Sequence, residues 1–377
     1  MNFEDVRKDF PIKRERVYLN NASIGPCSSR VTNAVSELLT DVQMRGRRHY
    51  PEWCRYADET ARTRAAQLIG AESTEIAWVP NTTQGIGLVA NGLDWHDGDN
   101  VIIADIEYPS NVYPWMNLKD RGVEVRFVEA RDGRIENAAI EALIDRRTRL
   151  ISLSSVQFSN GFRLDLDALC ELREKHGVLV HLDAIQHLGA LAMDVSTQPI
   201  DFLSAGGHKW LLGPIGSGVF YCRNASLEHL KPSVVGYHTV DKPLDHSDFE
   251  LTPRPGAARF EEALVNFPGI FGLDAAIETI LELGVDRVES YILGLTSVAI
   301  EGLREKGFDL LSSTAEEERS GVVAFQHPTI AAADIDSKLQ AAGVDVAVRR
   351  AALRISPSFY NDEDEIDRFL EALPSRA

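Results

Sequence analysis

An aspartate and a lysine in the middle of the chain follow two successive apolar runs. The run VLVHLD ends on Asp183, and the run DFLSAG is followed by Gly207, His208 and Lys209. Ligands of open α/β sheets collect at the carboxyl ends of the strands. If both runs are neighbouring strands, the carboxylate and the amine can therefore hold opposite ends of one flat ring.

Pyridoxal 5′-phosphate (PLP) chemistry needs this pair. A lysine forms a Schiff base with the cofactor, the internal aldimine, and a carboxylate keeps the pyridine nitrogen protonated so that the ring accepts electrons from the substrate Cα. Burial disfavours the charge of Lys209, which helps it act as nucleophile and later as general base. An aspartate at a strand end alone is more often a cap, and Gly-Gly-His-Lys alone is more often a loop. The combination makes Lys209 and Asp183 the candidate catalytic residues.

The segment from Asp183 to Gly218 resembles the class V aminotransferase family of fold-type I PLP enzymes, which includes cysteine desulfurases, cyst(e)ine C–S lyases and isopenicillin N epimerase-like proteins. The resemblance rests on Asp-x-x-Gln followed by Gly-His-Lys-x-x-Gly-Pro-x-Gly, and it extends with gaps over nearly the whole chain. It implies that Asp183 pairs with the pyridine nitrogen, Gln186 contacts the phenolic oxygen and His208 contacts the phosphate.

Further cofactor contacts follow from other motifs. PNTTQGIG resembles the family's Gly-Thr-Thr-Glu-Gly-Ile turn, and helix N-termini bind anions, so Thr82, Thr83 and Gln84 are phosphate candidates. The structural alternative is a plain N-cap. In IEYPSN, Tyr108 replaces the family's stacking histidine; it is a candidate for cofactor binding and catalysis, although it is not the same acid–base group. The resemblance implies that Asn160 contacts the substrate carboxylate or the phenolic oxygen.

LRISPSFYN resembles the family segment whose arginine binds the substrate α-carboxylate. Arg354 has this position, with Arg349 and Arg350 as adjacent alternatives, and a bidentate guanidinium suits a carboxylate. VYLNNASIGP resembles the N-terminal segment that folds over the site. The resemblance places three of its residues near the substrate: Asn21, Ala22 and Ser23.

The chain lacks the thiol that cysteine desulfurases use. That thiol lies on a loop shortly before the carboxylate-binding arginine. Here no cysteine follows Cys222, and only the four residues 350–353 separate Arg349 from Arg354. Persulfide-forming desulfuration is therefore disfavoured.

Two departures concern the phosphate site. Gly206 stands where the family usually has a serine, and Ala263-Leu264-Val265 stands where it has a Gly-Thr-Pro turn lent by the partner subunit. RFEE (259–262) and Asn266 still match the family. A homodimer is therefore predicted, with a PLP site less tightly built than in the family.

The reactions left open are β-elimination, transamination and epimerisation at Cα, which all begin with proton removal by Lys209. We favour a cyst(e)ine C–S lyase-like β-elimination, because GLDWHDGDNVI and PSVVGYHTV resemble that branch. An aminotransferase or an epimerase is the alternative. A PLP-binding regulatory module without turnover is a non-enzymatic alternative, and a nicotinamide dehydrogenase is disfavoured because no G-x-G-x-x-G follows the first strand.

The elements predict a fold-type I α/β architecture: a large domain with a mainly parallel seven-stranded sheet and a smaller C-terminal α+β domain. Expected strands lie at 75–80, 100–105, 123–128, 149–155, 178–183, 201–206 and 217–222, with helices at 135–145 and 166–177 among those between them. The proline-rich 251–260 marks the domain boundary. We therefore expect residues 1–30 to pack over the site, 31–250 to bind PLP and 251–377 to form the small domain.

Composition and charge exclude several other partners. The formal charge of −18 argues against nucleic acid, whose binders carry basic patches. The four cysteines are scattered, so neither a disulfide framework nor a metal site is expected. No signal sequence or membrane-spanning run is visible, so a cytoplasmic enzyme with a small amino acid substrate is predicted.

Overall fold

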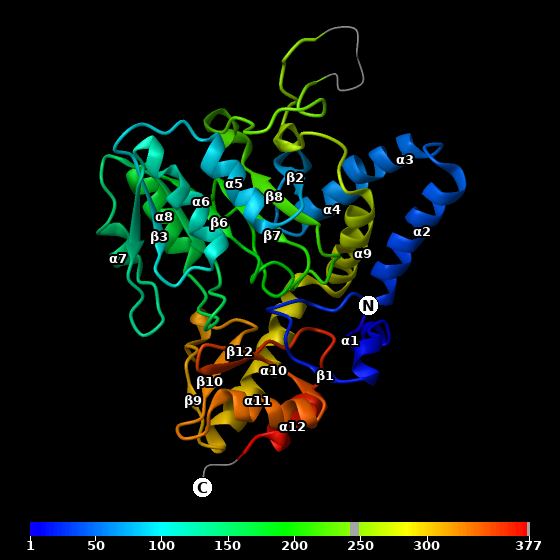
Figure 1. Ribbon diagram of the computed structural model, residues 1–377, viewed down its shortest axis with the longest axis vertical. Helices are drawn as coiled ribbons and strands as arrows, with labels where there is room; N and C mark the ends of the chain where they lie inside the picture. The colour runs from blue at the N-terminus through cyan, green and yellow to red at the C-terminus, as the bar shows by residue number, and fades with distance from the viewer. Residues whose placement is uncertain (242–248, 375–377) are drawn as a thin grey trace.

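The computed structural model describes residues 1–241 and 249–374, which form a large and a small domain (Figure 1). The large domain is built on a seven-stranded sheet of order β2-β8-β7-β6-β5-β3-β4; β8 runs antiparallel to both neighbours and the other pairs are parallel. The strands are β2 (Ile76–Val79), β3 (Asn100–Ala104), β4 (Glu124–Val128), β5 (Thr148–Ser154), β6 (Leu179–Asp183), β7 (Phe202–Gly206) and β8 (Gly218–Cys222). The predicted mainly parallel seven-stranded sheet is confirmed.

Helices cover both faces of this sheet. Along β3, Ile102 packs into a core shared with α4, α8 and α9, whereas Val101 and Ile103 pack into a second core shared with α5 and α6. A sheet buried on both faces needs nearly continuous apolar strands, which is the pattern of the sequence. The helices are α2 (Ser29–Arg45), α3 (Tyr50–Arg55), α4 (Arg62–Gln67), α5 (Thr82–Gly92), α6 (Tyr113–Met116), α7 (Asn137–Glu141), α8 (Leu166–His176) and α9 (Phe267–Leu283).

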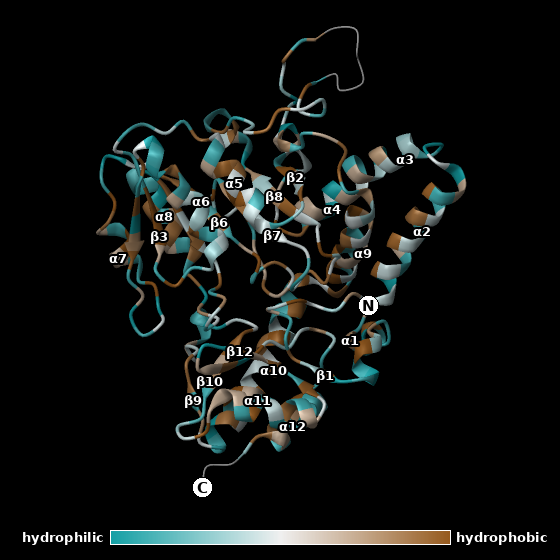
Figure 2. Cartoon of the chain, in the orientation of Figure 1, coloured by the Kyte–Doolittle hydropathy of each residue, from teal (hydrophilic) through white to brown (hydrophobic). Residues whose placement is uncertain are grey.

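The small domain packs three helices on an antiparallel sheet of order β12-β13-β10-β9. Its elements are α10 (Val285–Glu305), β9 (Asp309–Leu310), β10 (Val323–Gln326), α11 (Ala332–Ala341), β11 (Val344–Asp345), β12 (Ala347–Arg349), β13 (Ala352–Ile355) and α12 (Glu363–Ala372). The amphipathic α12 buries Ile366 and Phe369 and turns hydrophilic residues outward (Figure 2). It begins with a capping box between Asp362 and Glu365, which satisfies free backbone amides of its first turn.

Two expectations differ in detail from the observed elements. Of the helix expected over 135–145, only α7 is a regular α-helix. Beyond it, the amides of Leu143 and Ile144 donate to carbonyls three residues earlier, which is the tighter 3₁₀ pattern. The boundary at 251–260 stays a prediction. Buried residues of α9 such as Ile277 join the large core, and α10 from Leu295 onward joins the second core, so the packing favours a division within α10.

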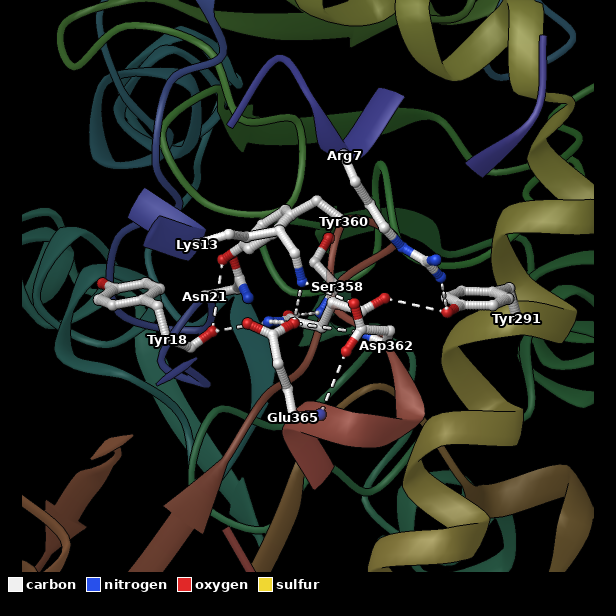
Figure 3. A network of polar contacts seen from close by, with 10 residues as sticks. Arg7, Lys13, Tyr18, Asn21, Tyr291, Ser358, Tyr360, Asp362 and Glu365 are labelled. Carbon is white, nitrogen blue, oxygen red and sulfur yellow. Dashed lines mark hydrogen bonds and ion pairs between the residues drawn. The ribbon is translucent and has the colours of Figure 1, made fainter. Parts of the chain in front are cut away.

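The N-terminal segment, with α1 (Phe3–Arg7) and β1 (Val17–Tyr18), is bound to α2 through the ion pair between Asp9 and Arg30 and also to the small domain. β1 pairs in parallel with β11, more than 300 residues away. Figure 3 shows the polar network beside this pairing, in which the Tyr360 hydroxyl donates to Asn21 Oδ1 at 3.1 Å and Lys13 pairs with Asp362 and Glu365. These buried bonds fix residues 17–25 against the small domain.

No helix in the described parts of the chain is both long and apolar enough to cross a membrane.

We predict that Tyr360→Phe loosens this attachment. The substitution leaves buried Asn21 Oδ1 without its donor, which should cost about 1–3 kcal/mol of the free energy of unfolding. Urea unfolding and the rate of proteolysis within residues 1–25 measure the effect. Tyr113→Phe, on an exposed side chain, is the matched control. Equal stability of the two variants would contradict the prediction.

Candidate active site

Polar residues lie at the carboxyl ends of four neighbouring parallel strands of the large sheet. Asp183 ends β6, Lys209 follows β7, Ser154 ends β5 and Glu107 follows β3. In the β5–β6 register, Ser154 pairs with Asp183, which brings the ends of these strands level. The predicted placement of Asp183 and Lys209 on adjacent strands is what the structure has.

Lys209 lies in an environment that disfavours its charge. Burial lowers the pKa of Lys209 to about 8, and the nearby Arg354 and Arg349 lower it further against the opposing effect of Asp183. Its Nζ lies 5.7 Å from the centre of the Tyr108 ring. Within the described residues the amine makes no hydrogen bond or ion pair, and its lowered pKa gives it a much larger neutral, nucleophilic fraction near pH 8 than an ordinary lysine has.

Asp183 lies near a second buried carboxyl group, that of Glu107. Burial raises the pKa of Asp183 to about 7, and the charge of Glu107 also raises it. The hydrogen bond from the Ile185 amide and the charge of Lys209 lower it. Glu107 is itself buried and accepts bonds from Ser154 and from Gln157 Nε2, the latter at 2.9 Å. A cationic ring nitrogen beside Asp183 would compensate this buried negative charge.

The start of α5 forms a place for an anion beside Lys209. Asn81 caps the helix through the amide of Gln84, which leaves the earlier amides of the first turn pointing outward. The hydroxyl of buried Thr82 accepts a bond from the amide of Gly206 at 2.9 Å and keeps its own hydrogen to donate. His208 Nδ1 is buried with no hydrogen-bond partner among the described residues.

Two arginines converge on one serine hydroxyl. Arg354, of which 1% is exposed, and Arg349 bind Ser23 Oγ at 3.0 and 2.8 Å. Arg354 also donates to the carbonyl of Phe158. Burial, with the neighbouring Arg349, lowers the pKa of Arg354 to about 9. Neither guanidinium forms an ion pair with any described residue, so the two together favour a bound anion such as a carboxylate.

The N-terminal segment connects these arginines to the large domain. Gln186 donates from Nε2 to the carbonyl of Ala22 at 3.0 Å and accepts from Trp210 at 2.8 Å, while the amide of Gly25 donates to the carbonyl of His208. Both ends of the Gln186 amide are therefore engaged, with one Nε2 hydrogen left to donate. Asn21 binds the carbonyl of Ser356 at 2.7 Å and so acts as a support for this segment.

Some predicted residues are less closely joined to this cluster. The Asn160 amide donates to the carbonyl of Gly133 and its oxygen accepts from the amide of Phe162, so both ends serve the loop. The exposed Thr83 donates to Ser110. Tyr108 is 47% exposed and packs edge-on against Phe158. Their roles toward cofactor and substrate stay predictions.

Sequence reasoning missed Glu107 and Gln157 as site residues. Gln157 is fully buried and its Oε1 has no partner within the described chain. The strand-end rule that selected Asp183 would also have selected both, because they follow the buried strands β3 and β5.

The residues present fit PLP. The first turn of α5, Thr82 and His208 supply donors for a phosphate, and Asp183 supplies a carboxylate for the ring nitrogen. Lys209 supplies a weakly basic amine for the aldehyde. The orphaned His208 Nδ1 is the observation that favours a missing anion most directly, since buried polar atoms are normally paired.

Comparisons with known proteins agree with this fit. A family model described as aminotransferase class-V matches residues 17–369. A probable cysteine desulfurase of Methanothermobacter thermautotrophicus is 34% identical over 300 residues, 78% of this chain and 74% of that protein. The apo structure of cysteine desulfurase from Thermococcus onnurineus NA1 has a TM-score of 0.89 at 26% identity, covering 98% of this chain and 96% of that one. A cystine C–S lyase solved with its product cysteine persulfide shares the fold, with a TM-score of 0.88 at 24% identity over 96% and 98% of the chains.

The pKa of Lys209 predicts the pH dependence of cofactor binding. The neutral amine attacks the aldehyde, and its fraction rises with pH through the folded-state pKa of about 8. The rate at which the apoprotein binds PLP should therefore rise with a midpoint near pH 8 rather than near the ordinary lysine value. Removing a cation in Arg354→Gln should raise the pKa of Lys209 and move the midpoint upward. Stopped-flow absorbance measures the pH profile of the wild type and of Arg354→Gln. Equal midpoints in the two proteins would show that Arg354 does not lower the pKa of Lys209.

Proposed function

The chain belongs to the class V aminotransferase family, and from this premise we propose that it catalyses β-elimination from a sulfur-containing amino acid, as a cyst(e)ine C–S lyase. The family makes it a PLP enzyme that acts on amino acid substrates. The reaction, the substrate and the role of each site residue are our proposal.

One observation carries the choice of reaction. β12 ends at Arg349 and β13 begins at Ala352, so a two-residue turn stands where a desulfurase would need a mobile thiol loop. No cysteine follows Cys222 in the sequence. A substrate sulfur bound here meets no thiol from this hairpin, which favours its departure as a thiolate over its transfer to the protein.

The residues of the site divide the work between binding and proton transfer. Arg354 binds the α-carboxylate, and Ser23 and the carbonyl of Phe158 hold its guanidinium in place. PLP, when bound, withdraws electrons from Cα. Lys209, whose pKa is lowered to about 8, takes the Cα proton. Asp183 holds the positive charge of the ring nitrogen.

The overall reaction balances without an added oxidant. The Cα–H and Cβ–S bonds break, and the sulfur leaves with the electron pair of the Cβ–S bond and takes up a proton. Water then hydrolyses the remaining three-carbon enamine. L-Cystine with water therefore gives pyruvate, ammonia and cysteine persulfide.

Product analysis tests the proposed reaction. The holoenzyme incubated with L-cystine should release pyruvate and ammonia in equal amounts, and Lys209→Ala should release neither above the background of free PLP. Alanine as the three-carbon product would indicate desulfuration and contradict the proposal. Conversion of the cofactor to its amine form, reversed by a 2-oxo acid, would indicate an aminotransferase.

Arg354→Gln should raise KM about 10- to 100-fold or more, because it removes charge-assisted bonds to the carboxylate. Arg349→Gln should have a smaller effect, since its guanidinium acts through Ser23. Steady-state kinetics with L-cystine compare the two variants. A larger effect of Arg349→Gln would assign the carboxylate to Arg349 instead.

A further inference from the structure

A fully buried histidine on β6 lies close to the cofactor residues and takes no part in the proposed proton transfers. His181 precedes Asp183 by two positions, so both side chains lie on the same face of the sheet. His181 is 0% exposed, and burial lowers the pKa of His181 to about 3, which keeps the ring neutral at physiological pH. A neutral imidazole has one N–H and one lone pair, so its two nitrogens must bind different kinds of partner.

Two serines on the neighbouring strands bind the two ring nitrogens of His181. Ser152 Oγ on β5 lies 2.9 Å from Nδ1, and Ser204 Oγ on β7 lies 2.9 Å from Nε2. Both serines are fully buried. A hydroxyl can donate or accept a hydrogen bond, so the distances alone do not place the hydrogen of the imidazole. Its place follows from what else the serines bind.

Trp115 fixes the direction of these hydrogen bonds. Its indole Nε1 can only donate, and it lies 3.0 Å from Asn111 Oδ1, which identifies that atom as the amide oxygen. Ser152 Oγ lies 2.6 Å from the same oxygen and therefore donates its one hydrogen to it. Ser152 must then accept from His181. The hydrogen of His181 is therefore on Nδ1, and Nε2 accepts from the hydroxyl of Ser204.

This chain of hydrogen bonds touches three elements that carry candidate cofactor residues. It begins beside α5, where a Cβ at Gly85 would collide with the Ser204 hydroxyl, so the helix packs directly on that serine. It crosses β6 two residues before Asp183. It ends in the 3₁₀ turn Pro109–Asn111, where the amide of Asn111 donates to the carbonyl of Tyr108 at 2.8 Å. The anion-binding helix, the strand of the carboxylate and the turn after Tyr108 are thus joined through one ring.

We propose that His181, with its hydrogen on Nδ1, is a positioning residue that holds α5, β6 and the turn after Tyr108 in fixed relative positions. Buried polar atoms are costly to leave unpaired, so loss of the ring would displace the serines on both sides of it. A displacement of about 1 Å in a site can lower a rate by about 100-fold. The role goes beyond the proposed elimination, because any reaction at Cα would use the same cofactor site.

NMR of the apoprotein tests the position of the hydrogen directly. His187, another buried histidine nearby, donates from Nε2 to the carbonyl of Ala192 at 3.0 Å, and burial lowers the pKa of His187 to about 4. The two rings should therefore be neutral with opposite tautomers, Nδ1–H in His181 and Nε2–H in His187. Proton–nitrogen correlation spectra, assigned with His181→Asn and His187→Asn, measure both. An Nε2–H or doubly protonated His181 would overturn the directed chain.

The same two variants separate positioning from stability. Each shortens a buried neutral ring and removes a hydrogen bond, so both should unfold at lower urea concentration than the wild type. Only His181→Asn should raise the dissociation constant for PLP, about tenfold or more, and change the visible circular dichroism of the bound cofactor. It should lower kcat for L-cystine more than it changes KM, because the arginines are not part of the chain. Equal changes in the two variants would overturn the positioning role.

Ser204→Ala gives a second test if His181→Asn does not fold. The substitution removes one hydroxyl and leaves the ring in place. It should raise the dissociation constant for PLP about threefold or more, while His181 keeps its hydrogen on Nδ1, because Ser152 still determines the tautomer. Unchanged PLP affinity in Ser204→Ala would overturn the positioning role. The affinity and the tautomer are measured without turnover, so they decide the role of His181 whether or not elimination occurs.

Discussion

The burial of Lys209 among like charges is the constraint on which the site depends. An amine removed from water and placed near Arg354 and Arg349 loses its proton at a pH where an exposed lysine keeps it. The arginines are held near it because Ser23 binds both and Phe158 binds one. The same positive cluster that prepares the lysine to react is the one that attracts a substrate carboxylate.

The parallel sheet supplies the rigidity that this arrangement needs. Asp183, Ser154 and Glu107 sit at strand ends whose register is fixed by a core on each face. Residues 17–25 then connect this edge to the small domain, through Ala22 to Gln186 and through Ser23 to the arginines. A displacement of the N-terminal segment would therefore disturb both cofactor and substrate contacts, which explains the dense polar network that holds it (Figure 3).

The strands and the Asp183–Lys209 pair could be predicted because they depend on local patterns. Apolar runs with glycine breaks identify buried strands, and the strand-end rule places their last residues at one edge. The parallel pairing of β1 with β11 could not be predicted, since it joins residues more than 300 positions apart. The bond of Asn160 to Gly133 and the bonds of Glu107 to Ser154 and Gln157 also join distant segments of the chain, which no single segment shows.

The most direct test of the account is to locate the cofactor chemically. Reduction of the holoenzyme with borohydride converts a Schiff base into a stable secondary amine, and mass spectrometry of the peptides identifies the modified lysine. We predict a phosphopyridoxyl group on Lys209 alone, with none in Lys209→Ala. Modification of another lysine, or no modification of a protein that binds PLP, would contradict it.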